Sequence, residues 1–143
     1  MDRIAVLAVL LALGVTVGVW RLRMDGRPRP SRPDRLAAAD LGAELGSAAT
    51  LVQFSTPVCA PCRSAHRVLS AVAADTPGAR HVEVDAEQRL DLTRRFGVLR
   101  TPTVLVLDAD GQVVRRSSGV PSPEQVRQAL SATRAIVPEG HHD

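Results

Sequence analysis

The chain has 143 residues, enough for one domain with a short extension but too few for a two-domain nucleotide-binding enzyme. Hydrophobic residues make up 45% and charged residues 23%, which excludes wholesale disorder and collagen-like or coiled-coil architectures. Aromatic residues make up only 2%, so a stacking platform for single-stranded nucleic acid is not expected either. The core must therefore be aliphatic.

Positive charge is concentrated at the N-terminus. The formal net charge is +3, and all 18 basic residues are arginines. Residues 1–35 carry seven arginines against three aspartates, a net charge of +4, whereas residues 36–143 carry eleven arginines against twelve acids, a net charge of −1. Because the basic character belongs to a short segment, it favours a membrane over a nucleic acid as the partner.

An uncharged, apolar run of 17 residues lies within this segment, from Ile4 to Trp20. As a helix it would rise about 25 Å, at the short end of a bilayer crossing, and it lacks the polar stripe of a buried core helix. A cleaved secretory signal is the second interpretation, but Arg21-Leu22-Arg23 follows in place of a small-residue cleavage site. We therefore expect a single transmembrane helix over residues 1–21 that anchors the protein in the cell membrane.

The arginines also predict an orientation for that helix. Six of them fall within the fifteen residues after the apolar run, and only Arg3 precedes it, with Asp2 cancelling its charge. Positive residues stay on the cytoplasmic side, so the main domain is predicted to be cytoplasmic. Residues 22–35, in which arginines alternate with three prolines, are predicted to form an extended linker.

Residues 36–137 alternate helical and strand-like patterns without an internal repeat, which indicates an α/β domain. The predicted elements, in chain order, are a short helix over 36–45 ending at Gly46, a strand over 50–54, a helix ending before a turn at 75–78, a strand over 81–85, a helix capped by Asp85 and running to Arg95, a strand over 103–107, a hairpin turn at 108–111, its return strand over 112–116, and a last helix. Ser122 and Gln125 form a capping box at the start of that last helix. Residues 138–143 are expected to be a disordered tail.

The two cysteines, Cys59 and Cys62, are separated by two residues and lie between a predicted strand and the start of a predicted helix. A helix N-terminus stabilises a thiolate, so Cys59 is the candidate nucleophile. The Cys59 thiolate would attack a substrate disulfide, and Cys62 would then attack the mixed disulfide and release the reduced substrate. Pro61 stiffens the turn between the two cysteines.

Two other interpretations of this pair are a structural disulfide and half of a metal site. The loop that such a disulfide closes is too small to add much stability. Zinc needs two further ligands, which a second cysteine pair or a spaced histidine pair would normally supply. His66 lies four residues after Cys62, but a lone histidine there is more often exposed to solvent. We therefore predict no metal and no cofactor.

The segments LVQFSTPVCAPC, HVEVD and FGVLRTPT, together with Gly119, resemble the thioredoxin family over nearly all of residues 36–137. The resemblance implies a thioredoxin fold, in which helices flank a central mixed β-sheet. It also implies that the bond between Thr101 and Pro102 is cis and lies against the active disulfide, and that Gly119 lies beside the active-site surface. The residues expected to bind substrate are Val58, Ala60, Pro61, Thr101, Pro102 and Gly119.

Several positions depart from the family pattern. Gln53 stands where a buried aspartate helps to deprotonate the second cysteine, and a glutamine cannot be that base. His81 stands at the position of the aspartate's lysine partner, and Arg67 at that of a helix-kinking proline. Ser55 and Val58 replace tryptophans that flank the first cysteine. The choice of partner is therefore expected to differ from that of an ordinary thioredoxin.

The leading hypothesis is a membrane-anchored, monomeric thiol:disulfide oxidoreductase that reduces protein disulfides through Cys59 and Cys62. The alternative is an interaction or redox-sensing module that scaffolds a membrane partner without turnover. A third hypothesis, an exported oxidase, is disfavoured because Ala-Pro between the cysteines resembles a reducing Gly-Pro dipeptide. The expected electron donor is a thioredoxin reductase for a cytoplasmic domain. If the domain is extracytoplasmic, as single-span thiol proteins often are, the donor would be a membrane electron carrier.

Overall fold

The structure is a computed structural model that describes residues 3–25 and 35–136. The chain separates into two compact units, Met1–Arg32 and Pro33–Asp143. Residues 26–34, which make up most of the predicted linker, lie outside the described residues. The predicted tail at 138–143 lies outside them as well.

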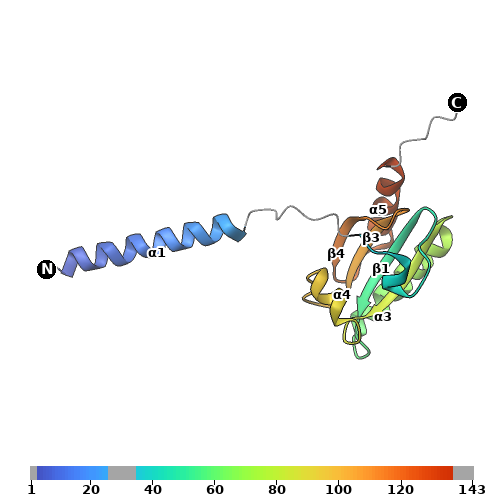
Figure 1. Ribbon diagram of the computed structural model, residues 1–143, viewed down its shortest axis with the longest axis horizontal. Helices are drawn as coiled ribbons and strands as arrows, with labels where there is room; N and C mark the ends of the chain where they lie inside the picture. Colours follow the sequence, from blue (N-terminus) through green and yellow to red (C-terminus); the bar gives the residue numbers. More distant parts are fainter. Residues whose placement is uncertain (1–2, 26–34, 137–143) are drawn as a thin grey trace. The chain divides into compact units, whose positions relative to one another are not determined.

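The described residues of the first unit form the helix α1 (Arg3–Asp25), which continues through residues 22–25 (Figure 1). Within residues 3–25 and 35–136, no helix has both the length and the apolar character needed to cross a membrane. The prediction that a spanning helix anchors the protein in the cell membrane is therefore wrong, and the predicted orientation of the domain across that membrane falls with it. The uncharged run of 17 residues rises only about 25 Å as a helix, whereas the hydrocarbon core of a bilayer is about 30 Å thick.

The second unit is built on a mixed sheet of four strands in the order β2-β1-β3-β4 (Figure 1). The strands are β1 (Ala49–Ser55), β2 (Ala79–Asp85), β3 (Thr103–Asp108) and β4 (Val113–Ser118). β1 pairs in parallel with β2 and antiparallel with β3, and β3 and β4 form an antiparallel hairpin. The predicted strands and the central mixed sheet are confirmed. Every residue of β1 is buried, because this strand lies inside the sheet and is covered on both faces.

Helices α3 (Ala60–Asp75) and α5 (Pro123–Ile136) cover one face of the sheet, where Leu51 of β1 packs with Leu69 and Leu130. On the other face, α4 (Leu90–Arg95) packs Leu92 against Phe54 of β1. Neighbouring positions of β1 serve opposite faces because side chains alternate along a strand.

Two predicted helices are shorter than expected. The helix predicted over 36–45 is only α2 (Ala38–Leu41), because the chain turns at Gly42, which has the left-handed φ of 62°. The helix predicted to begin after Asp85 begins at Leu90 instead. The Asp85 carboxylate accepts the backbone N–H groups of Glu87 and Gln88, at 2.8 and 3.3 Å, and this holds the intervening residues in a turn.

The segment that enters the second unit is fixed to the hairpin. Arg35 forms an isolated antiparallel bridge with Gln112, and the Leu36 N–H donates to Gly111 O at 2.8 Å. The Leu36 side chain is fully buried in the α4 face of the core. The folded core therefore begins at Leu36.

Candidate active site

The cysteine motif lies between the end of β1 and the start of α3. Cys59 is the N-cap of α3, with extended backbone angles, and Pro61 lies in the first turn, where its missing N–H costs no helical hydrogen bond. The Cys59 Sγ accepts the backbone N–H of Cys62 at 3.2 Å. A thiolate at this position is therefore stabilised by the Cys62 N–H group and by the positive end of the helix dipole.

Cys59 and Cys62 form a disulfide, with their Cα atoms 5.2 Å apart. The two residues differ in their access to solvent. Cys59 is half-buried, whereas Cys62 is only 2% exposed. An incoming group therefore meets Cys59 first.

The chain that connects α4 to β3 reaches the same place. The peptide bond between Thr101 and Pro102 is cis, which confirms the expectation from the resemblance. The Thr101 hydroxyl donates to Cys59 Sγ at 3.7 Å, and the Gly119 N–H donates to Pro102 O at 2.8 Å. Gly119 adopts a φ of 88°, which a residue with a side chain rarely takes.

The other residues expected at this surface are the neighbours of the cysteines. Val58 is 91% exposed, and Ala60 and Pro61 are also exposed. Sequence reasoning missed Leu99, which is 94% exposed in the chain segment that leads to Thr101. The signal available in the sequence was an apolar residue within FGVLRTPT, a segment that already carried the resemblance to the family.

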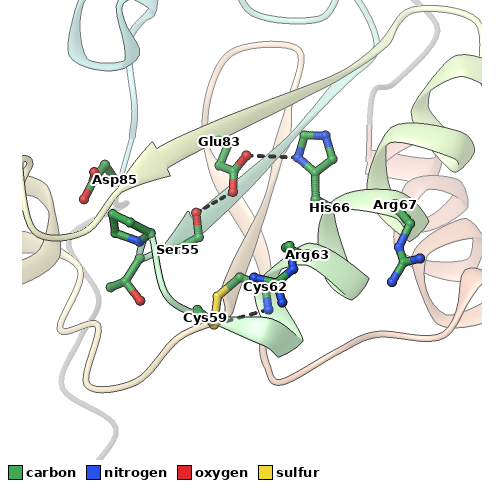
Figure 2. Close-up of a pocket in the computed structure, with 10 residues that line it drawn as sticks. Ser55, Cys59, Cys62, Arg63, His66, Arg67, Glu83 and Asp85 are labelled. Carbon is green, nitrogen blue, oxygen red and sulfur yellow. Dashed lines mark hydrogen bonds and ion pairs between the residues drawn. A yellow bond between two sulfur atoms is a disulfide. The ribbon is translucent and has the colours of Figure 1, made fainter.

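A groove of about 810 Å³ opens beside the disulfide. Figure 2 shows side chains that line it. Arg63, His66 and Arg67 of α3 line it together with Cys59 and Cys62. The opposite wall comes from the ends of β1 and β2 and includes the side chains of Ser55, Glu83 and Asp85. The groove thus combines cations from the helix with carboxylates from the sheet.

Glu83 bridges the two walls of the groove (Figure 2). One carboxylate oxygen accepts the Ser55 hydroxyl at 2.5 Å, and the other lies 2.9 Å from His66 Nδ1. Sequence reasoning treated His66 as a lone exposed histidine and did not single out Glu83. The signal was the alternation of the HVEVD strand, which places Glu83 on the same face as His81 and Asp85.

Behind Cys62, the sheet presents the fully buried amide of Gln53. Its Nε2 donates to Cys62 O at 2.8 Å, and its Oε1 accepts from His81 Nε2 at 3.0 Å. Burial, and then the neighbouring His66, lower the pKa of His81 to about 4. His81 is therefore neutral at pH 7, so the two residues that replace the family's aspartate and lysine form an uncharged, hydrogen-bonded pair.

Comparisons with known proteins agree with this architecture. A family model described as a thioredoxin-like domain matches residues 42–134. The chain is 32% identical over 87 residues to a thioredoxin of Chlamydia muridarum, covering 61% of this chain and 84% of that protein. It is 29% identical over 90 residues to a thioredoxin of Bacillus subtilis, covering 62% and 86%.

Solved structures show the same likeness. Fasciola hepatica thioredoxin superposes with a TM-score of 0.54 at 25% identity, over 62% of this chain and 83% of that one. The thioredoxin NaTrxh of Nicotiana alata gives a TM-score of 0.53 at 28% identity, over 59% and 73%. With the Cys59–Cys62 pair at the start of α3, these matches show that the chain belongs to the thioredoxin-like family and is a thiol:disulfide oxidoreductase.

Proposed function

We propose that this oxidoreductase reduces disulfide bonds of protein substrates, with Cys59 as the nucleophile and Cys62 as the resolving cysteine. The observation that carries the proposal is the unequal access of the two sulfurs, half-buried Cys59 at the helix N-cap and buried Cys62 behind it. In the reduced protein, the Cys62 N–H and the helix dipole stabilise the Cys59 thiolate, which is the attacking form of a thiol.

The exchange takes two steps. The Cys59 thiolate attacks one sulfur of the substrate disulfide and bonds to it, and the other substrate sulfur leaves as a thiolate that takes up a proton. Cys62 then loses its thiol proton and attacks Cys59 Sγ, and the second substrate sulfur leaves and is protonated. The substrate gains two electrons and two protons, and the protein is left with the Cys59–Cys62 disulfide.

Substrate would dock on the surface around Cys59. The Thr101 hydroxyl contacts Cys59 Sγ, Pro102 follows Thr101, and the Gly119 N–H donates to Pro102 O. Exposed apolar side chains on this rim, Val58 and Leu99, are typical of a protein-binding surface. The proposed substrate-binding residues are Val58, Ala60, Pro61, Thr101, Pro102 and Gly119.

A second partner must return two electrons to the disulfide after each cycle. The chain is 28% identical over 85 residues to part of the NADPH-dependent thioredoxin reductase 3 of Arabidopsis thaliana, a match that covers 16% of that protein. We propose a reductase of the thioredoxin reductase class as the donor. Both cysteines and the docking residues come from one chain, which supports action as a monomer.

The test is reduction of insulin disulfides by the protein with a thiol reductant as electron donor. Cys59→Ser is expected to abolish turnover and to leave no mixed disulfide with substrate. Cys62→Ser is expected to stop after the first step, leaving a mixed disulfide on Cys59 that mass spectrometry detects. Ser64→Ala, a neutral change on the same helix, serves as the control. Turnover that survives in Cys59→Ser would contradict the proposal.

A further inference from the structure

The groove wall that α3 forms carries two arginines beside the active disulfide. Arg63 and Arg67 follow Cys59 by four and eight residues, so the three positions lie along one side of the helix. At a rise of about 1.5 Å per residue, the arginines lie about 6 and 12 Å from Cys59 along the helix axis. Both line the groove together with Cys59, and Figure 2 shows both side chains projecting from α3. A substrate bonded to Cys59 therefore has two guanidinium groups within reach.

These two guanidinium groups are available for a ligand. Both side chains are exposed, and within the described part of the chain neither has a hydrogen-bond or ion-pair partner. The carboxylates of the opposite wall are already engaged. Glu83 contacts the Ser55 hydroxyl and the His66 ring, and Asp85 accepts two backbone N–H groups of the turn after β2. Because these carboxylates repel another carboxylate, an acidic group that enters the groove is directed to the α3 wall.

The spacing of the arginines fits an extended acidic segment. A guanidinium presents a planar fork of N–H donors that matches the two oxygens of a carboxylate. An extended chain rises about 3.3 Å per residue and turns every second side chain to the same face. When a substrate cysteine is bonded to Cys59, the residues two and four positions away therefore lie about 7 and 13 Å along the α3 wall. These are the positions of Arg63 and Arg67 to within the reach of their side chains.

We propose that Arg63 and Arg67 select protein substrates that carry acidic side chains two and four residues from the reacting cysteine. The inference rests on the proposed function and names the substrate class of the same site. Thr101, Pro102 and Gly119 are not among the residues that line the groove, so the two surfaces hold different parts of the substrate. Complementary charge of this kind determines which partner reacts and how fast it associates.

The test compares four peptide dimers of equal length, each joined by one disulfide at a central cysteine. The first carries glutamates two and four residues from the cysteine on both sides, the second carries glutamines there, and the third carries lysines. The fourth carries the same glutamates nine and eleven residues from the cysteine, about 30 Å away or more in an extended chain. The fourth peptide has the net charge of the first but cannot place its acids beside both arginines.

The rate constant is measured in single turnovers of the full-length reduced protein with excess peptide and no other thiol. Samples quenched in acid are read by mass spectrometry as reduced and oxidised protein. Acidic neighbours also change the thiol pKa of the peptide and hence the reactivity of its disulfide. Each rate constant is therefore divided by that of the same peptide with dithiothreitol, which is uncharged.

At an ionic strength of about 0.1 M, the peptide with nearby glutamates is expected to react about fivefold faster than the glutamine peptide, because exposed ion pairs are individually weak. The lysine peptide should react more slowly than the glutamine peptide, and the peptide with distant glutamates within about twofold of it, because charges are screened over about 10 Å. At about 1 M, where screening acts over about 3 Å, the preference for nearby glutamates should fall below about twofold.

The double variant Arg63→Gln/Arg67→Gln is expected to lower the ratio of the nearby-glutamate rate to the glutamine rate to less than about twofold at 0.1 M. The matched control is Arg94→Gln/Arg127→Gln, which removes the same charge from exposed arginines of α4 and α5 outside the groove and should keep the ratio. Thermal unfolding checks that both variants remain folded.

Three results would overturn the inference: no preference for nearby glutamates in the wild type, equal rates for nearby and distant glutamates, or a wild-type ratio in Arg63→Gln/Arg67→Gln. The peptides would still be reduced in each case, so the proposed function would stand. If the reduced wild-type protein reduces none of the four peptides, the proposed function fails and this inference fails with it.

Discussion

The contact between half-buried His81 and buried Gln53 makes the stability of the domain depend on pH. Burial lowers the pKa of His81 to about 4, against 6.5 for the ordinary side chain. Between these values the unfolded chain binds a proton that the folded chain does not, so the free energy of unfolding falls as the pH falls through this window. The full contribution is present above pH 6.5. Between pH 7 and pH 5, this group alone is expected to cost about 2 kcal/mol.

Urea unfolding of the oxidised protein at pH 7 and pH 5 measures this loss. The comparison is with His81→Gln, which keeps a polar side chain at the position but does not titrate. The wild type is expected to lose about 2 kcal/mol more than the variant on acidification. The contact between His66 and Glu83 is present in both proteins, so its contribution cancels. Equal losses in the two proteins would show that His81 is not held neutral by the fold.

At the scale of elements, Arg116 of β4 links the sheet by hydrogen bonds to the segment that leads to the cis proline. Its guanidinium donates to Phe96 O, and it also donates to Gly97 O at 2.8 Å. These carbonyls lie at the end of α4, where the chain sets out towards Thr101 and Pro102. A forked guanidinium can serve two carbonyls at once, whereas a single glutamine amide at the end of a shorter side chain cannot.

Arg116→Gln is therefore expected to loosen the segment between α4 and β3. The KM for a protein disulfide should rise severalfold with little change in kcat, and the free energy of unfolding should fall by about 1 kcal/mol. Steady-state insulin reduction and urea unfolding measure the two effects. Arg115→Gln, an exposed arginine next to it on β4, should change neither. An unchanged KM in Arg116→Gln would mean that substrate docking does not depend on the hydrogen bonds of Arg116.

Short sequence patterns correctly predicted the strands and helices that are determined by residues close together in the chain. Strands β1 and β3 followed from their buried β-branched runs, and α5 from the capping box of Ser122 and Gln125. In that box, the Ser122 N–H donates to Gln125 Oε1 at 2.9 Å, and the Gln125 N–H donates to Ser122 Oγ at 3.2 Å. Such patterns are read correctly because each hydrogen bond joins residues three apart.

Features that depend on how elements meet were harder to predict. The lengths of α2 and α4 were overestimated because single residues, Gly42 and Asp85, offer the backbone a turn that helical spacing does not reveal. Sequence placed Cys59 and Cys62 correctly at the start of α3. The contact between His66 and Glu83 was not predicted from the sequence. These residues are 17 positions apart and meet only because α3 packs against β2. The register between elements, rather than the local sequence, sets that contact.

At the scale of the whole molecule, every member of the two core clusters lies at Leu36 or later in the sequence. Leu36 itself is 0% exposed, and its N–H is bonded to the hairpin at Gly111 O. We therefore expect a chain of residues 33–143 to keep the free energy of unfolding of the full chain within about 0.5 kcal/mol. It should also keep the rate of insulin reduction, because all the proposed site residues are retained.

In the same shortened chain, Leu36→Ala should lower the free energy of unfolding by about 2–5 kcal/mol, because it opens a cavity in the α4 face of the core. Leu99→Ala, at a leucine that is 94% exposed, is the control and should cost less than about 0.5 kcal/mol. Urea unfolding measures both changes. If removal of residues 1–32 alone lowers the free energy of unfolding by more than about 1 kcal/mol, the first unit stabilises the second. If Leu36→Ala has only a small effect on that free energy, the core begins later than Leu36.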